Sequence, residues 1–151
     1  DLGKLVNQAK IAASVEGAAG LAMRHLEAAK DEMIMGAERR SAVITDDDRR
    51  LTAFHEGGHA LVALLTPAAI PIHKATIVPR GQALGMVAQL PDRDDLSLTR
   101  QQLLARLDVA MGGRAAEELV FGAAQVTTGA ASDFRQATDI ARAMVTQYGM
   151  S

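Results

Sequence analysis

The chain has 151 residues and a formal net charge of −2, a length that suits one domain with a real core or a core plus a piece of a second domain. The near-neutral charge excludes the basic footprint of a nucleic-acid-binding protein, and the absence of cysteine excludes a disulfide framework and a Cys-ligated zinc site. The longest apolar stretch, near residues 60–65, is far too short to span a membrane.

Two helices are predicted in the first 35 residues. Apolar residues recur at helical spacing over 2–13, and the pattern resumes over 21–35 after a glycine-containing interruption. Gly36 is typical of the residue that follows a helix. The charged residues at 38–41 predict a solvated connection rather than a partner site. We interpret His25, in the second helix, as a surface residue.

A third helix is predicted over 45–65, and it carries the most informative residues of the chain. Thr45 is a good N-cap, and the three aspartates after it favour a helix start because the helix dipole stabilises negative charge there. The sequence His-Glu-Gly-Gly-His places His55 and His59 on one helix face, just over a turn apart. Two imidazoles at this spacing can bind one zinc ion, and Glu56 can act as a base on a water at the metal.

The two glycines inside this motif contradict the helical pattern. Gly57 and Gly58 each cost about 1 kcal/mol relative to alanine in a helix interior. We therefore expect a neighbouring helix or a substrate to approach closely at this point. The alternative interpretation treats His55 and His59 as ordinary polar residues of a half-exposed helix, and the motif in its helical context argues against it.

Two short strands and two more helices are predicted in the second half. Residues 72–78 and 85–90 are rich in apolar and β-branched residues and are bounded by prolines and glycines, which indicates two strands that could form a hairpin. Helical spacing follows over 99–119 and over 133–148, with a small polar loop predicted at 127–132. Ser97 is expected to begin the first of these helices and Gly122 to close it.

The third zinc ligand cannot be chosen from spacing. A catalytic zinc normally has three protein ligands and an open position for water, and the motif supplies two of them. His73 lies at a predicted strand start, and its distance from His59 does not match the extended form of the motif, in which a third histidine follows shortly downstream. The carboxylate candidates are Glu117 or Glu118 near one helix end and Asp133 at the next helix start. Each could equally be an ordinary helix charge, so both possibilities stay open.

Four segments of the chain together resemble one protein family. In order they read HEGGHAL from residue 55, HKATIVPRG from residue 73, MGGRAAEELVFG from residue 111 and TTGAASDFRQATDIARAMV from residue 127. This series resembles the peptidase M41 domain of FtsH-type membrane AAA proteases, which are ATP-dependent zinc metalloproteases. The first two segments look most like i-AAA-like members from organelles, in mitochondria or chloroplasts.

The resemblance implies roles for five residues. It implies a zinc site made of His55, His59 and Asp133, with Glu56 as the catalytic base. Glu117 matches the family glutamate that sits behind the metal within hydrogen-bond reach of a ligand, where it orients that ligand and raises its basicity. The implied reaction is peptide hydrolysis, in which Glu56 takes a proton from the attacking water and passes it to the leaving amine.

We expect a mainly α-helical fold with a small β-sheet beside the motif helix. Residues 1–38 resemble the C-terminal end of the AAA lid and its junction, and residues 39–151 resemble the M41 peptidase domain, truncated at its C-terminus. The sequence contains no G-x-x-x-x-G-K-[ST] phosphate loop, so ATP is expected to act only through an AAA module absent from this chain. The family's membrane anchor is likewise expected to lie outside it.

The resemblance also implies a role for the whole protein. It implies a membrane-anchored, hexameric protease that degrades unfolded or damaged membrane and soluble proteins. No nucleic-acid partner is expected, because the charge provides no basic footprint. The mitochondrial inner membrane or the chloroplast is the expected location, with the bacterial plasma membrane as the alternative. The strand at 85–90 could hold an extended substrate backbone by strand addition. A folded but inactive scaffold and a stand-alone zinc hydrolase are the rival interpretations; the intact motif residues argue against the first, and the AAA-like start argues against the second.

Overall fold

The computed structural model describes residues 1–39, 41–81, 83–91 and 96–150. It is mainly α-helical with a small β-sheet, as predicted. The elements are α1 (Leu2–Glu16), α2 (Met23–Met35), α3 (Asp46–Leu65), β1 (Ile72–Thr76), β2 (Met86–Gln89), α4 (Arg100–Phe121), η1 (Ala123–Gln125), η2 (Thr128–Ala130) and α5 (Ala131–Thr146). Two compact units form, one from Asp1–Ala42 with Val78–Ala83 and the other from the rest of the chain. None of the described helices has the length and apolar character needed to cross a membrane.

The first unit is built on two packed helices. α1 packs against α2, and the buried apolar residues of the two helices are small or flexible, namely Ala9, Ala13, Ala29 and Met35. Gly17 and Gly36 follow the two helices with φ of 72° and 86°, a backbone conformation that glycine adopts without strain. The helix end predicted at Gly36 is therefore confirmed.

His25 is buried in this unit, so its prediction as a surface residue was wrong. Its residue exposure is 3%. Its Nε2 lies 2.8 Å from Oε2 of Glu16, and its Nδ1 accepts a hydrogen bond from the Ala22 backbone N–H at 3.0 Å. Both ring nitrogens are thus paired inside the protein, which removes the penalty for burying them.

Most of the segment between the two strands, Val78–Ala83, belongs to the first unit. Arg80 donates to the Gly36 carbonyl and to the Glu38 carboxylate, both at 2.8 Å. Glu38, Arg39 and Ser41 are exposed, as predicted, and Glu38 is in addition paired with Arg80. Arg40, in the same predicted connection, lies outside the described residues.

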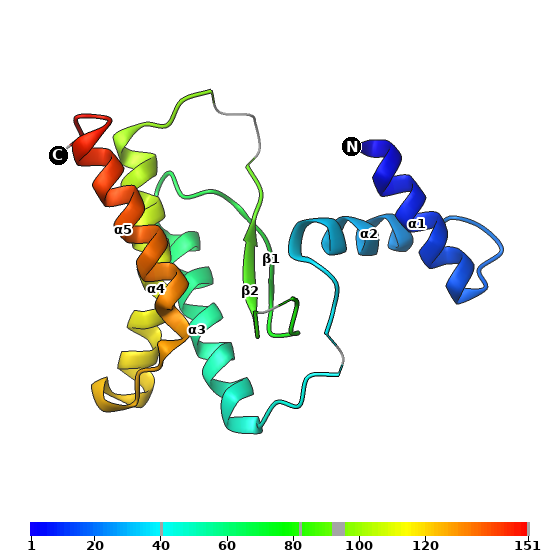
Figure 1. Cartoon of the computed structure of the whole chain (residues 1–151), viewed down its shortest axis with the longest axis horizontal. Coiled ribbons are helices and arrows are strands. Elements are labelled where there is room, and N and C mark those ends of the chain that lie inside the picture. Colours follow the sequence, from blue (N-terminus) through cyan, green and yellow to red (C-terminus); the bar gives the residue numbers. More distant parts are fainter. Residues whose placement is uncertain (40, 82, 92–95, 151) are drawn as a thin grey trace. The chain divides into compact units, whose positions relative to one another are not determined.

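The second unit is built around α3, which begins where the sequence predicts. The Thr45 hydroxyl accepts a hydrogen bond from the Asp48 N–H at 3.1 Å, which caps the helix. The buried residues of α3 recur every three or four positions at Thr52, His55, His59 and Ala63, so they form one stripe. This stripe contributes to the packing of α3 against α4, and α4 also packs against α5; the three helices lie side by side in Figure 1.

The crossing of α3 and α4 depends on one glycine of the predicted pair. A Cβ atom on Gly58 would lie 2.3 Å from the Gly112 carbonyl oxygen, and one on Gly112 would lie 2.8 Å from the Gly58 oxygen. Both distances are far below ordinary contact, so the two backbones approach only because neither residue has a side chain. A Cβ on Gly57 would meet no described atom within 4 Å. The predicted close approach of a neighbouring helix is confirmed, and it occurs at Gly58.

The two strands form the expected antiparallel hairpin within the second unit. Thr76 pairs with Met86 and Ala75 with Val87, and both strands contact α3. The strands are shorter than predicted, since β1 ends at Thr76 and β2 begins at Met86. The small sheet beside the motif helix is confirmed, and Gly85 lies immediately before the second strand.

The last two helices differ from the prediction at their starts. α4 is capped by Thr99 rather than begun at Ser97, and Thr99 and Gln102 form a reciprocal capping box. The predicted loop at 127–132 instead contains η2 and the first residues of α5. Along α5, Asp133, Ala137, Ile140 and Met144 are buried or half-buried and share one face. Asp133 thus lies at the N-terminal end of the face that packs inward.

Candidate metal centre

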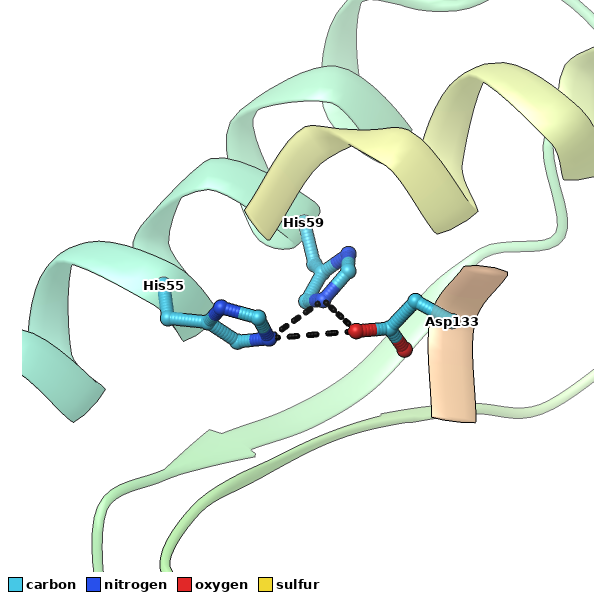
Figure 2. Close-up of side chains that lie close together, drawn as sticks. All are labelled: His55, His59 and Asp133. Atoms are coloured by element: carbon cyan, nitrogen blue, oxygen red, sulfur yellow. Dashed lines mark hydrogen bonds and ion pairs between the residues drawn. The ribbon is translucent and has the colours of Figure 1, made fainter. Parts of the chain in front are cut away.

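Three potential metal ligands converge between α3 and α5. Nε2 of His55 lies 3.1 Å from Nε2 of His59, and Oδ2 of Asp133 lies 3.3 Å and 3.6 Å from these two nitrogens. Figure 2 shows both rings descending from α3 toward the carboxylate on α5. Within the described part of the chain, these residues are the group identified as able to hold a metal ion, and His73 is outside it.

α4 leaves room for this cluster because it has a glycine beside the rings. A Cβ atom on Gly113 would lie 2.5 Å from Nε2 of His59 and 2.6 Å from Nε2 of His55. Any side chain here would occupy the space at the converging nitrogens. The adjacent glycines of α4 therefore have different tasks, since Gly112 allows the helices to cross and Gly113 keeps the ligand atoms uncovered.

The orientation of both rings is fixed from α4. Nδ1 of His55 lies 2.7 Å from Oε1 of Glu117, and Nδ1 of His59 lies 2.7 Å from the Val109 carbonyl oxygen. A carboxylate and a carbonyl can only accept, so each Nδ1 carries a proton and donates it. A ring whose only proton is on Nδ1 presents the lone pair of Nε2 to the centre, which is the tautomer that a metal ligand requires.

The arrangement fits a zinc ion. Two imidazole nitrogens and one carboxylate oxygen are a usual donor set for catalytic zinc. Tetrahedral ligands at about 2.0–2.1 Å from zinc are separated by about 3.3 Å, close to the three distances between the donor atoms. Lone pairs that converge at such distances repel one another unless a proton or a cation lies among them. The donor set, its spacing and the space kept by Gly113 all agree with the ion.

The electrostatics of the cluster favour positive charge. The hydrogen bond with Asp133 raises the pKa of His55, against the opposing effect of burial. Burial acts to lower the pKa of His59, but hydrogen bonds to Asp133 and to the Val109 carbonyl outweigh it and raise that pKa. The pKa of Asp133 lies well below its usual range. Burial acts to raise this pKa, but the hydrogen bonds with the two imidazoles outweigh that effect. Asp133 is therefore an anion throughout the neutral pH range.

Glu56 lies beside the cluster and is half-buried. Burial raises the pKa of its carboxyl, and the nearby imidazoles act in the opposite direction. The start of β2 lies against it, because a Cβ atom on Gly85 would come within 2.7 Å of its Cγ. A carboxylate with a raised pKa is better matched to proton transfer near neutral pH than an ordinary glutamate.

Glu117 is completely buried, with a residue exposure of 0%. One oxygen accepts from His55, and the other accepts from the Thr127 N–H at 2.8 Å and the Thr127 hydroxyl at 3.1 Å. Burial acts to raise the pKa of Glu117, but the hydrogen bonds from Thr127 and His55 outweigh it and lower the pKa. The group behind His55 is therefore a fully paired carboxylate. Glu118, the neighbouring candidate, is instead exposed and lies 3.6 Å from Arg114.

The family is established by comparison with known proteins. A family model, described as peptidase family M41, matches residues 42–151. The chain belongs to this family. The whole chain is 59% identical to ATP-dependent zinc metalloprotease FTSH 11, chloroplastic/mitochondrial, of Arabidopsis thaliana, covering 19% of that protein. It is 54% identical to ATP-dependent zinc metalloprotease FtsH of Caulobacter vibrioides, covering 24% of it, and 54% identical to ATP-dependent zinc metalloprotease YME1L1 of Homo sapiens, covering 20%.

The resemblance to FtsH-type M41 proteases seen in the sequence is thereby confirmed. The chain spans about a fifth to a quarter of the length of these relatives. The relatives with chloroplastic, mitochondrial and bacterial names are similarly close, so the comparison does not separate these origins.

The structure brings together the five residues to which the resemblance gave roles. His55, His59 and Asp133 converge, Glu56 flanks them, and Glu117 contacts His55 from behind. Sequence reasoning did not find the Val109 carbonyl or the supporting residues Gly85, Gly113 and Thr127. A backbone carbonyl has no signal in a sequence. The paired glycines within the predicted helix 99–119 were a usable signal, because glycine is costly there.

Proposed function

We propose that this chain is the zinc-dependent endopeptidase part of a larger ATP-dependent protease. Zinc would be held by His55, His59 and Asp133, and Glu117 would orient His55 as a ligand. The observation that carries the proposal is the convergence of three donor atoms, with both rings held in the metal-binding tautomer, beside the half-buried carboxylate of Glu56.

A bound zinc ion supplies Lewis-acid chemistry, because it polarises a peptide carbonyl and lowers the pKa of water toward about 7. Glu56 takes a proton from the attacking water as the water oxygen adds to the carbonyl carbon. The protonated Glu56 then gives that proton to the leaving nitrogen as the C–N bond breaks. One water is consumed and Glu56 returns to its starting state. Asp133 and Glu117 stay ionised throughout, which keeps negative charge around the imidazoles.

The substrate would be an extended polypeptide. β2 begins next to Gly85, and Gly85 lies against Glu56, so a chain paired alongside this strand would run past the base. Pairing through backbone hydrogen bonds depends little on side chains. This mode suits unfolded protein of varied sequence, delivered by an ATP-driven partner module.

The whole protein would be a membrane-anchored homo-oligomer, a hexamer. Residues 1–38 would form the end of the AAA lid and its junction, and residues 39–151 would belong to the peptidase domain. The names of the relatives join ATP dependence to zinc metalloprotease activity, which supports the ATP-dependent part of this proposal. The location would be the mitochondrial inner membrane or the chloroplast, or else the bacterial plasma membrane. Its substrates would be unfolded or damaged membrane and soluble proteins.

The test is cleavage of casein, a loosely folded protein, by the zinc-loaded chain and by Glu56→Gln. The amide keeps the shape of the side chain but cannot accept the proton, so the variant should bind zinc normally and lose hydrolysis. Glu118→Gln is the matched control, because it makes the same change at an exposed glutamate of α4. Cleavage by Glu56→Gln at the rate of the control would contradict the assigned base. Stoichiometric zinc with no cleavage by the unsubstituted chain would favour the inactive scaffold.

A further inference from the structure

We propose that Thr127 is a positioning residue for the metal centre, acting on His55 through Glu117. This inference rests on the proposed zinc site and adds a residue to it. Thr127 touches neither imidazole, yet its backbone N–H and its hydroxyl both contact Oε2 of Glu117, at 2.8 Å and 3.1 Å. Oε1 of the same carboxylate accepts from Nδ1 of His55 at 2.7 Å.

The geometry explains why Glu117 needs such a partner. Its side chain is wholly buried and ionised, so every oxygen that lacks a donor carries a large desolvation cost. Its two oxygens face different elements, one toward α3 and the other toward the segment before η2. With Oε2 held by two donors from one residue, the carboxylate cannot rotate. Oε1 is therefore held in line with the His55 N–H bond.

Thr127 also belongs to the element that leads to Asp133. Its hydroxyl oxygen accepts a hydrogen bond from the Gly129 N–H at 3.1 Å and so caps η2. η2 runs directly into α5, which carries Asp133 in its first turn. One hydroxyl thus donates to the carboxylate behind one ligand and accepts from the turn that introduces another. This double contact makes the side chain, and not only the backbone N–H, part of the support.

Substitutions of Thr127 can test its positioning role without disturbing the folded core. Thr127 is exposed, so Thr127→Val keeps the branched shape, removes the hydroxyl and opens no cavity in the core. Thr127→Ser restores the hydroxyl without the methyl group. Thr128→Val is the matched control, because it makes the same change one residue later in the same turn.

The experiment measures zinc affinity of each variant by chelator competition, and the NMR resonance of the His55 Nδ1–H proton. Thr127→Val should weaken zinc binding by about tenfold, at the lower end of the 10- to 100-fold loss typical when a partner of a ligand is removed. It should also move the Nδ1–H resonance, because the hydrogen bond to Glu117 changes. Thr127→Ser and Thr128→Val should behave like the unsubstituted chain.

A double substitution distinguishes action through Glu117 from simple capping of η2. In a Glu117→Gln background, Thr127→Val should cause no further loss of zinc affinity, because the carboxylate it orients is already gone. An equal loss in both backgrounds, or a Thr127→Val variant that binds zinc like the unsubstituted chain, would overturn the inference while leaving the zinc site intact. An unsubstituted chain that binds no zinc would overturn the proposed function and this inference together.

Discussion

Alanine substitution of the two adjacent motif glycines should change stability in opposite directions. At Gly58 the new Cβ would lie 2.3 Å from the Gly112 carbonyl oxygen and 2.6 Å from the Ala116 Cβ. Ordinary contacts begin near 3.4 Å, so α3 and α4 must separate by about an ångström, a deformation of the overpacking kind. At Gly57 no described atom lies within 4 Å of the new Cβ, and the helix conformation itself favours alanine.

The magnitudes follow from these two environments. Overpacking at a close helix crossing costs about 1–3 kcal/mol, so Gly58→Ala should lower the free energy of unfolding by that amount. Alanine at an exposed helix position is better than glycine by about 0.8–1.0 kcal/mol, so Gly57→Ala should raise it. At about 2–4 °C per kcal/mol for a chain of this size, the melting temperatures should lie roughly 10 °C apart.

Thermal unfolding followed by circular dichroism measures the difference, and zinc titration of the same samples adds a second readout. Separation of the helices moves Glu117 and the Val109 carbonyl away from the rings they orient, so Gly58→Ala should also bind zinc more weakly. Gly57→Ala should bind zinc like the unsubstituted chain. Equal melting temperatures for the two variants, or a more stable Gly58→Ala, would refute the close crossing of α3 and α4.

The other predictions concern the centre itself. Asp133→Ala should weaken zinc binding far more than Glu117→Ala, which should lower zinc affinity by only about 10- to 100-fold. If a zinc titration gives the reverse order, Glu117 is the ligand and Asp133 is not. Gly85→Ala should lower kcat while zinc stays bound, because its Cβ would lie 2.7 Å from Cγ of Glu56; unchanged casein cleavage would show that this contact does not place the base. As the pH is lowered, zinc affinity should begin to fall at a pH above about 6.5, the ordinary pKa of histidine. The reason is that protons compete with zinc for imidazoles whose pKa values are raised. A zinc affinity that stays constant well below about pH 6.5 in chelator competition would contradict this.

Local signals in the sequence were enough to predict the helix that carries the site. Thr45 and the aspartates after it are a helix start that needs no tertiary information, and the four-residue spacing of His55 and His59 fixes their common face. The third ligand was different. Asp133 lies 74 positions after His59 in the sequence. Only the packing of α5 against α4, which itself packs against α3, brings the carboxylate to the rings, so spacing left Asp133 tied with Glu117.

What the sequence did not show has similar physical reasons. Gly57 and Gly58 have the same helix propensity, and only the helix crossing shows which of them faces another backbone. His25 was read as a surface residue because its partner Glu16 lies across the α1–α2 turn, where pairing depends on tertiary packing. Strand ends shifted because the segment after Ile77 packs in the first unit rather than continuing the ladder.

X-ray absorption at the zinc edge tests the central claim most directly, because it counts the ligand atoms of the bound ion. For the zinc-loaded chain we expect stoichiometric zinc with two imidazole nitrogens and oxygen donors at about 2.0–2.1 Å. Asp133→Ala should lose its protein carboxylate donor, whereas Glu117→Ala should keep the same donor set. A site with three imidazoles, or a spectrum that Asp133→Ala leaves unchanged, would contradict a centre built from His55, His59 and Asp133.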